Sequence, residues 1–169
     1  WLFATVTIGL LMLPVAVWLD LNSMSHHNLH RQATSLNTLM SGFRGYYAEN
    51  VTGRITQGGT TSALHNYHNI DGAIPIPATL SIEMGDIITE KLRGVGYRFV
   101  SDFPFTNRPA HELSEFEQHA LYQFRNAADA PEMMIHETGN LLDHQMMLVT
   151  PVTMSESCVS CHNTHALSP

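Results

Sequence analysis

Cys158-Val159-Ser160-Cys161-His162 lies close to the C-terminus, and the rest of the chain can be understood from what these five residues require. Two cysteines separated by two residues and followed at once by histidine form the attachment signature of c-type haem. Each thiol can form a thioether with one vinyl group, and the adjacent imidazole can then ligate the iron. The chain has 2 cysteines. The motif therefore predicts one covalent haem c, attached through Cys158 and Cys161, with His162 as the proximal ligand.

Three other kinds of site could use the same five residues. A thioredoxin-like redox pair would open a helix after a strand in a βαβ pattern and would not need the histidine. A zinc site could draw on Cys158, Cys161 and His165, but structural zinc needs four well-spaced ligands and the chain has no second cysteine pair. A disulfide would close a very short and strained loop.

Composition limits the class of protein. The 169 residues suggest one domain plus its termini, and 44% hydrophobic content is enough for a sizeable core. The formal charge of -7, from 8 basic against 15 acidic residues, argues against nucleic acid as a partner. No Ser-His-Asp triad or glycine-rich phosphate motif is apparent, so the chain is not expected to be an enzyme.

Residues 1–19 carry no charge, which is typical of a helix that crosses a bilayer. Trp1 and Trp18 suit the two interfaces, and Pro14 can kink the helix. A signal-peptide core or a buried helix are the alternatives. We expect residues 1–20 to form a transmembrane anchor and residues 21–169 an extracytoplasmic haem c domain, because haem c is attached outside the cytoplasm. The expected location is the bacterial inner membrane, single-pass, with the haem domain in the periplasm.

Apolar periodicity and turn residues predict the elements beyond the anchor. The expected helices are 21–51, as one long helix or two in series, 78–92 and 112–124. The expected strands are 97–102, 133–136 and 144–154. The expected loops are 53–72, 103–109, a turn at 137–140 and the haem loop. His26, His27 and His30, just beyond the anchor, are expected to be solvated. This order predicts an α+β domain with an antiparallel sheet.

Several stretches together resemble a known family, the single-haem, PAS-like periplasmic domains catalogued as a domain of unknown function. The matching stretches are Arg44–Val51, Ile74–Thr79, Ser101–Pro109, Phe116-Glu117, Pro151–Ser155 and Cys158–His165. The resemblance implies a PAS-like antiparallel sheet with a long N-terminal helix that crosses the haem, here preceded by one transmembrane helix.

The resemblance also carries an expectation about function. Relatives occur in bacterial signalling proteins and as small cytochromes, and many form the extracytoplasmic sensor of cyclases, kinases or chemoreceptors between two transmembrane helices. This chain reaches Pro169 without a second span or an output domain, which favours electron transfer. At least one relative uses a cysteine on the long helix as the distal iron ligand, and no cysteine is left here for that role.

The second axial ligand and the propionate partners are predicted from the same helix and its neighbours. Met40 lies on the apolar face of the long helix and is the predicted sixth ligand. The alternatives are His136, Met133, Tyr46 and His165. Basic side chains should pair with haem propionates. The candidates are Arg44, Arg98 and Arg108.

The resulting hypothesis is a membrane-anchored mono-haem c domain that acts through the redox or ligand state of its iron. Its first form is a redox or gas sensor that passes a shift along the long helix to a signalling partner or output domain. Its alternative is an electron-transfer cytochrome subunit of a membrane complex, with a redox partner protein. A homodimer is possible in either case.

Overall fold

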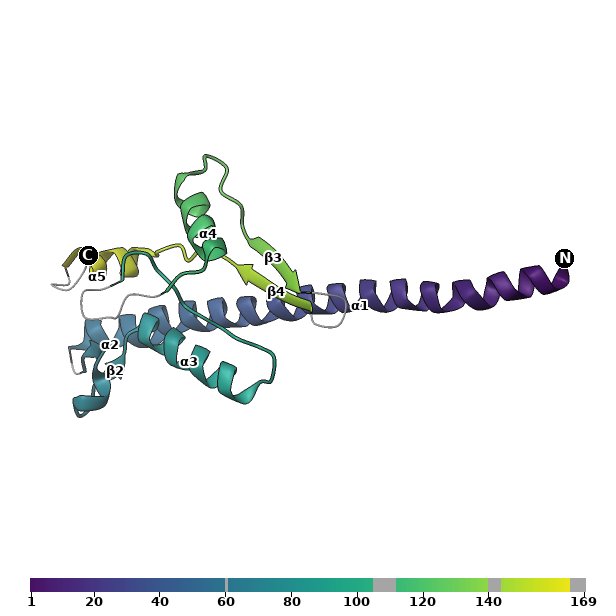
Figure 1. Cartoon of the computed structure of the whole chain (residues 1–169). Coiled ribbons are helices and arrows are strands. Elements are labelled where there is room, and N and C mark those ends of the chain that lie inside the picture. Colours follow the sequence, from purple (N-terminus) through teal and green to yellow (C-terminus); the bar gives the residue numbers. More distant parts are fainter. Residues whose placement is uncertain (60, 105–111, 140–143, 165–169) are drawn as a thin grey trace. The chain divides into compact units, whose positions relative to one another are not determined.

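The computed structural model describes residues 1–59, 61–104, 112–139 and 144–164 and combines helices with small sheets (Figure 1). The helices are α1 (Leu2–Tyr47), the π-helical turn η1 (Ala48–Thr52), α2 (Gly53–Gly58), the 3-10 turn η2 (Tyr67–Asn69), α3 (Pro77–Lys91), α4 (Glu115–Asn126) and α5 (Glu156–Thr164). The strands are β1 (Ala63–Leu64), β2 (Ile74–Pro75), β3 (Met134–Gly139) and β4 (His144–Val149).

The chain divides into two compact units. The first contains Trp1–Leu36 and Ile135–Leu148, and the second contains the other described residues. The predicted mixture of helix and sheet is confirmed. Each sheet of the described residues has two strands, whereas the sequence predicted three strands in one antiparallel sheet.

Helix α1 runs without interruption from Leu2 to Tyr47, so the predicted anchor and the predicted long helix are one element. Pro14 lies inside it and does not end it. Its N-terminal part is long and apolar enough to cross a membrane. The large apolar side chains from Trp1 to Leu21 are all exposed, as lipid contact would require.

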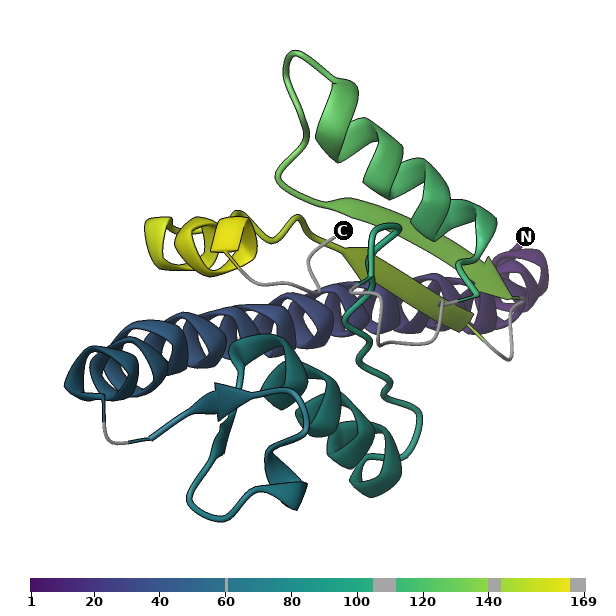
Figure 2. The same cartoon turned by 90° about the vertical axis from the view of Figure 1, so that its left-hand side faces the viewer.

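In the first unit, β3 and β4 pair side by side and run in opposite directions (Figure 2). The strand pair was predicted, but with other ends. β3 continues through Gly139, so the predicted turn at 137–140 is wrong for residues 137–139. β4 ends at Val149, shortly before Pro151, which has no N–H to donate to a ladder.

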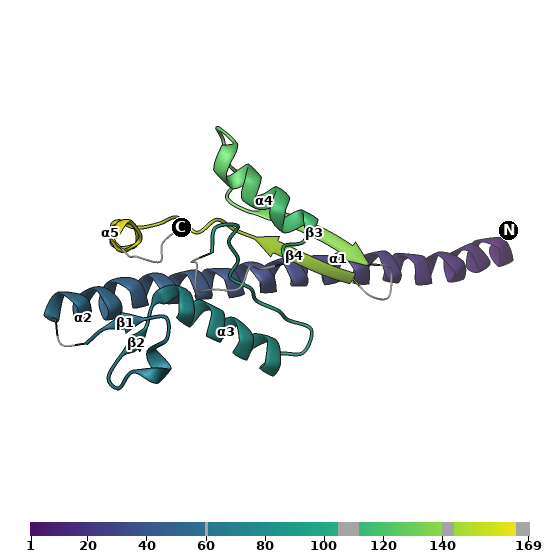
Figure 3. The ribbon, with the colours of Figure 1, turned by 60° about the vertical axis from the view of Figure 1, so that its left-hand side comes forward.

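In the second unit, residues 53–72 are not the predicted polar loop. Helix α2 follows η1 directly and is capped at its C-terminal end by Gly59, whose φ of 68° is the left-handed conformation that glycine adopts without strain. β1 then pairs with β2 in parallel, Ala63 opposite Ile74 (Figure 3). Helix α3 starts at Pro77, where proline suits the first turn, close to the predicted start at Ala78.

The predicted strand at 97–102 does not form. The Tyr97 backbone N–H donates to the Thr89 side-chain oxygen at 3.4 Å, and the Tyr97 carbonyl passes over Gly85 of α3. The alternation of apolar residues here reflects packing of an extended segment on a helix. It does not reflect pairing with another strand.

Gly85→Ala is expected to destabilise the second unit. A Cβ at position 85 would lie 2.7 Å from the Tyr97 carbonyl oxygen, a backbone atom that cannot rotate away. Such overpacking costs about 1–3 kcal/mol, while alanine in a helix interior gains only about 1 kcal/mol over glycine. Chemical denaturation of the full chain in detergent measures the loss. Gly96→Ala is the control, because its nearest neighbour would be 4.0 Å away, and an equal loss there would contradict the explanation.

Candidate functional site

The Cys158–His162 motif lies in helix α5, Glu156–Thr164, where a loop was predicted. Glu156 occupies the first turn, where its negative charge stabilises the helix by interacting with the positive end of the helix dipole. The Val159 backbone N–H bonds the Ser155 carbonyl at 3.0 Å. In a helix, positions three and four apart share one side. This conformation therefore brings positions 158, 161 and 162 to one side of α5.

The Cys158 thiol is half-buried and is not in a disulfide, so the disulfide interpretation is not supported. Its sulfur lies 3.2 Å from the Ser155 hydroxyl oxygen. His162 is half-buried in the same helix. A free thiol and an imidazole on one helical side are two of the three groups that covalent haem c needs.

Helix α5 packs against the π-helical turn η1. In η1 the Gly53 N–H bonds the Ala48 carbonyl, five residues back. A Cβ at Gly53 would come within 3.2 Å of that same oxygen, so glycine suits the turn. π-helical turns inside helices are rare and frequently mark functional sites. The motif helix therefore contacts a non-α turn that directly continues α1.

The C-terminal part of α1 has an exposed apolar face formed by Leu39, Phe43 and Tyr46, which are 70%, 49% and 64% exposed. Their helical spacing puts them on one side together with Gly42, beside which no atom lies within 4 Å of a Cβ position. Among the described residues, only Met40 and Ala120 are fully buried apolar residues. An apolar surface of this kind fits a large prosthetic group or a second polypeptide.

Whereas Phe43, three residues further along α1, is 49% exposed, Met40, the predicted sixth ligand, is 5% exposed. Helical spacing groups it with Arg44 and Tyr47. The Tyr47 hydroxyl donates to the Pro75 carbonyl at 2.8 Å, and burial raises the pKa of this phenol above its ordinary value. Because Met40 is buried, its ligation of the iron would require the haem to reach this packed side chain.

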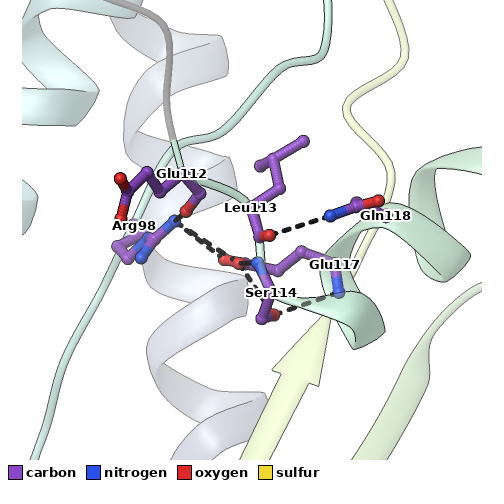
Figure 4. Close-up of polar contacts among 6 residues, drawn as sticks. All are labelled: Arg98, Glu112, Leu113, Ser114, Glu117 and Gln118. Carbon is purple, nitrogen blue, oxygen red and sulfur yellow. Dashed lines mark hydrogen bonds and ion pairs between the residues drawn. The ribbon is translucent and has the colours of Figure 1, made fainter.

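The predicted propionate partners differ in what already holds them. Arg44 Nη1 donates to the Tyr97 hydroxyl oxygen at 3.4 Å, and the Arg44 guanidinium carbon lies 5.4 Å from the centre of the Phe99 ring. Arg98 is paired with the buried Glu117 carboxylate at 3.3 Å and donates to the Glu112 carbonyl at 3.1 Å (Figure 4). Arg108 lies outside the described residues. Arg44 is a better candidate for a propionate partner than Arg98, because Arg98 already neutralises the Glu117 carboxylate.

The alternative sixth ligands are dispersed. Met133 is half-buried, and Tyr46 and His136 are exposed. His165, and with it part of the zinc interpretation, lies outside the described residues. The side chain of Cys161 is likewise not described, although its backbone belongs to α5.

The first unit contains a cluster that the sequence did not predict. His26, expected to be solvated, is half-buried, and its Nδ1 lies 3.2 Å from Glu137 Oε1. Glu137 Oε2 lies 3.6 Å from His144 Nε2. His27 and His30 are exposed, as expected. No short-range spacing signals the cluster, because its members come from α1, β3 and β4.

The segment that begins at Ser101 is anchored to α4 by an ion pair. Arg125 Nη2 lies 2.6 Å from Asp102 Oδ1, and its guanidinium carbon lies 4.8 Å from the Phe103 ring centre. The hydrogen bond from Arg125 holds the pKa of the Asp102 carboxyl below its ordinary value.

Asp102→Asn is expected to cost up to about 1 kcal/mol at pH 7, the size of an exposed ion pair. Since the folded-state pKa is the lower one, this stabilisation is present above the unfolded pKa of about 3.9 and is lost as the pH falls through the folded value. Denaturation midpoints measured between neutral and acid pH should therefore converge for the two proteins. A constant gap at all pH values would contradict the ion pair, and the exposed Asp71→Asn is the control.

Comparison with known proteins finds one family. The family model described as Tll0287-like (Tll0287) matches residues 22–169. No curated protein and no solved structure matches the chain. The match begins just beyond the uncharged N-terminal run and includes α5 with its Cys158–His162 motif.

Proposed function

We propose, because this chain belongs to the Tll0287-like family, that it is a membrane-anchored mono-haem c protein whose periplasmic, PAS-like domain serves as the redox or gas input of a bacterial signalling system. Cys158 and Cys161 would hold the haem as thioethers, and His162 would be the proximal ligand. Haem bound there would supply reversible one-electron redox chemistry and an iron position for a small ligand. No catalytic role is proposed for any residue.

The observation that carries the proposal is the contact of α5 with η1 at the end of α1. His162 lies in α5, so a change in its bond to a haem iron would act on that helix. The turn it touches has i→i+5 bonding, one residue out of step with the α-helix before it. A turn that can adopt two hydrogen-bonding patterns can be biased by such a displacement. Because α1 is continuous from Leu2, the bias can reach the membrane segment.

Carbon monoxide binding to the reduced, detergent-solubilised full chain tests the sensor proposal. We expect CO to shift the haem absorption, because a sensor needs an open or displaceable sixth position. An iron that stays six-coordinate and indifferent to CO would overturn gas sensing. If, in addition, the reduction potential of the haem did not change when a ligand was added, the result would support the electron-transfer alternative.

Met40→Leu tests the predicted sixth ligand. Leucine keeps the apolar volume of this buried side chain, at a cost below about 1.5 kcal/mol, and removes the thioether. If Met40 ligates the iron, the variant should change the ligand-field spectrum and bind CO about tenfold more tightly, because the competing ligand is gone. An unchanged spectrum in a stably folded variant would assign Met40 to the core. Met84→Leu, at a half-buried methionine of α3 that is not a candidate ligand, is the matched control.

The partner proposals follow from the surface. The N-terminal part of α1 would lie in the membrane. The exposed face of Leu39, Phe43 and Tyr46 is where a homodimer would pair along α1, and a signalling or redox partner protein would receive the output. Nucleic acid is not among the proposed partners, because the net charge is -7.

A further inference from the structure

We infer that His26, Glu137 and His144 form a binding site for a divalent transition metal, with zinc as the best match, which joins α1 to the β3–β4 sheet of the first unit. The three potential ligand atoms lie within 4.8 Å of one another. Two imidazoles and one carboxylate are a donor set that Zn²⁺ uses with water in the fourth position. This site is separate from the Cys158–His162 motif and does not depend on haem.

The distances already approach those of a coordination sphere. Ligands at about 2.0–2.1 Å from a tetrahedral metal are about 3.4 Å apart. His26 Nδ1 and Glu137 Oε1 are 3.2 Å apart, and His144 Nε2 and Glu137 Oε2 are 3.6 Å apart. The two imidazole rings lie with their centroids 4.3 Å apart at an angle of 51°. The two distances to Glu137 involve different oxygens of its carboxylate, so the side chains would have to rotate for all three to reach one ion.

A second observation points to a ligand here. His144 Nε2 has under 1 Å² of exposed surface and no hydrogen-bond partner among the residues that the structure describes. A buried polar nitrogen without a hydrogen bond is costly, and a metal ion would satisfy it better than the Glu137 carboxylate 3.6 Å away. The side chains of His26, Glu137 and His144 are 39%, 36% and 29% exposed, which leaves a route for an ion from solvent.

The place of the site suggests what the metal does. His26 lies about 10 Å along the helix axis beyond Leu19, where the uncharged run ends. Glu137 belongs to β3 and His144 to β4, so one ion would connect both strands to the helix as it leaves the membrane segment.

Nitrogen ligands select zinc, copper or nickel over the hard cations Mg²⁺ and Ca²⁺. We therefore expect the site to discriminate by metal type.

Calorimetric titration with ZnCl₂ tests the inference on the full, haem-loaded chain in detergent after treatment with EDTA. We expect one zinc per chain with a micromolar or lower Kd, unaffected by millimolar Mg²⁺. His26→Ala and His144→Ala should each weaken binding about tenfold or more. Glu137→Gln keeps the side-chain volume and should also weaken binding, so the test does not depend on how well the alanine variants fold.

The chain offers two matched controls. His27→Ala removes an exposed histidine next to His26. His68→Ala removes a histidine that forms another imidazole–carboxylate pair, with Nε2 3.3 Å from Glu83 Oε1. Among the described residues, this pair has no second imidazole that could complete a metal site. Both should bind zinc as the parent does. Absence of binding, or binding that survives Glu137→Gln together with either alanine change, would overturn the site.

Discussion

Replacing both Cys158 and Cys161 by serine is expected to abolish covalent haem in a host that matures c-type cytochromes. A serine hydroxyl does not form the thioether, and the chain has 2 cysteines, so no other thiol can substitute. The readout is haem that stays with the denatured polypeptide, seen as peroxidase stain on a gel and as the intact mass. Full retention of covalent haem would contradict the assignment of the motif.

His162→Ala separates attachment from ligation. Both thiols remain in this variant, so haem should still be attached, while the ligand-field spectrum should change because the proximal imidazole is gone. Asn163→Ala, an exposed change in the same helix, should leave mass and spectrum as in the parent. If His162→Ala had the parent spectrum, another residue would have to be the proximal ligand.

Local signals in the sequence predicted those parts of the fold that local interactions determine. The uncharged run and the apolar periodicity predicted α1, and Pro77 marked the start of α3. The predicted strand at 97–102 was wrong because alternation of apolar and polar residues does not show whether an extended segment pairs with a strand or packs on a helix. The Tyr97 segment packs on α3 at Gly85, a contact between residues distant in sequence. The glycines in 53–72 suggested a loop, yet one of them ends a short helix, α2.

The same distinction applies to the sites. The spacing of Cys158, Cys161 and His162 predicts haem because the three residues lie within about one helical turn of each other. The helix itself was not predicted. The sequence offered no comparable signal for His26, Glu137 and His144, whose proximity depends on how β3 and β4 pack on α1. Arg98 was proposed for a propionate from its position in a matched stretch. Its pairing with Glu117 could be found only from the folded chain.

Glu117→Ala is expected to have the largest effect on stability of any single polar substitution discussed, about 2–3 kcal/mol. Glu117 is 6% exposed and closes the capping box at the start of α4. Its carboxylate accepts from the Ser114 backbone N–H at 2.8 Å and from the Ser114 hydroxyl at 2.9 Å (Figure 4). Loss of such a cap costs about 1–2 kcal/mol, and leaving a partly buried N–H without its acceptor adds to that cost.

The ion pair with Arg98 contributes the smaller share of this loss, because the arginine side chain is 57% exposed and remains solvated when its partner is removed. Arg98→Ala should therefore cost no more than about 1 kcal/mol, and Glu117→Gln, which can still accept from Ser114, should fall between the two. Chemical denaturation of the full chain in detergent ranks the variants, with the exposed Glu115→Ala as the control from the same turn. If Arg98→Ala cost as much as Glu117→Ala, the ion pair and not the helix cap would hold this end of α4.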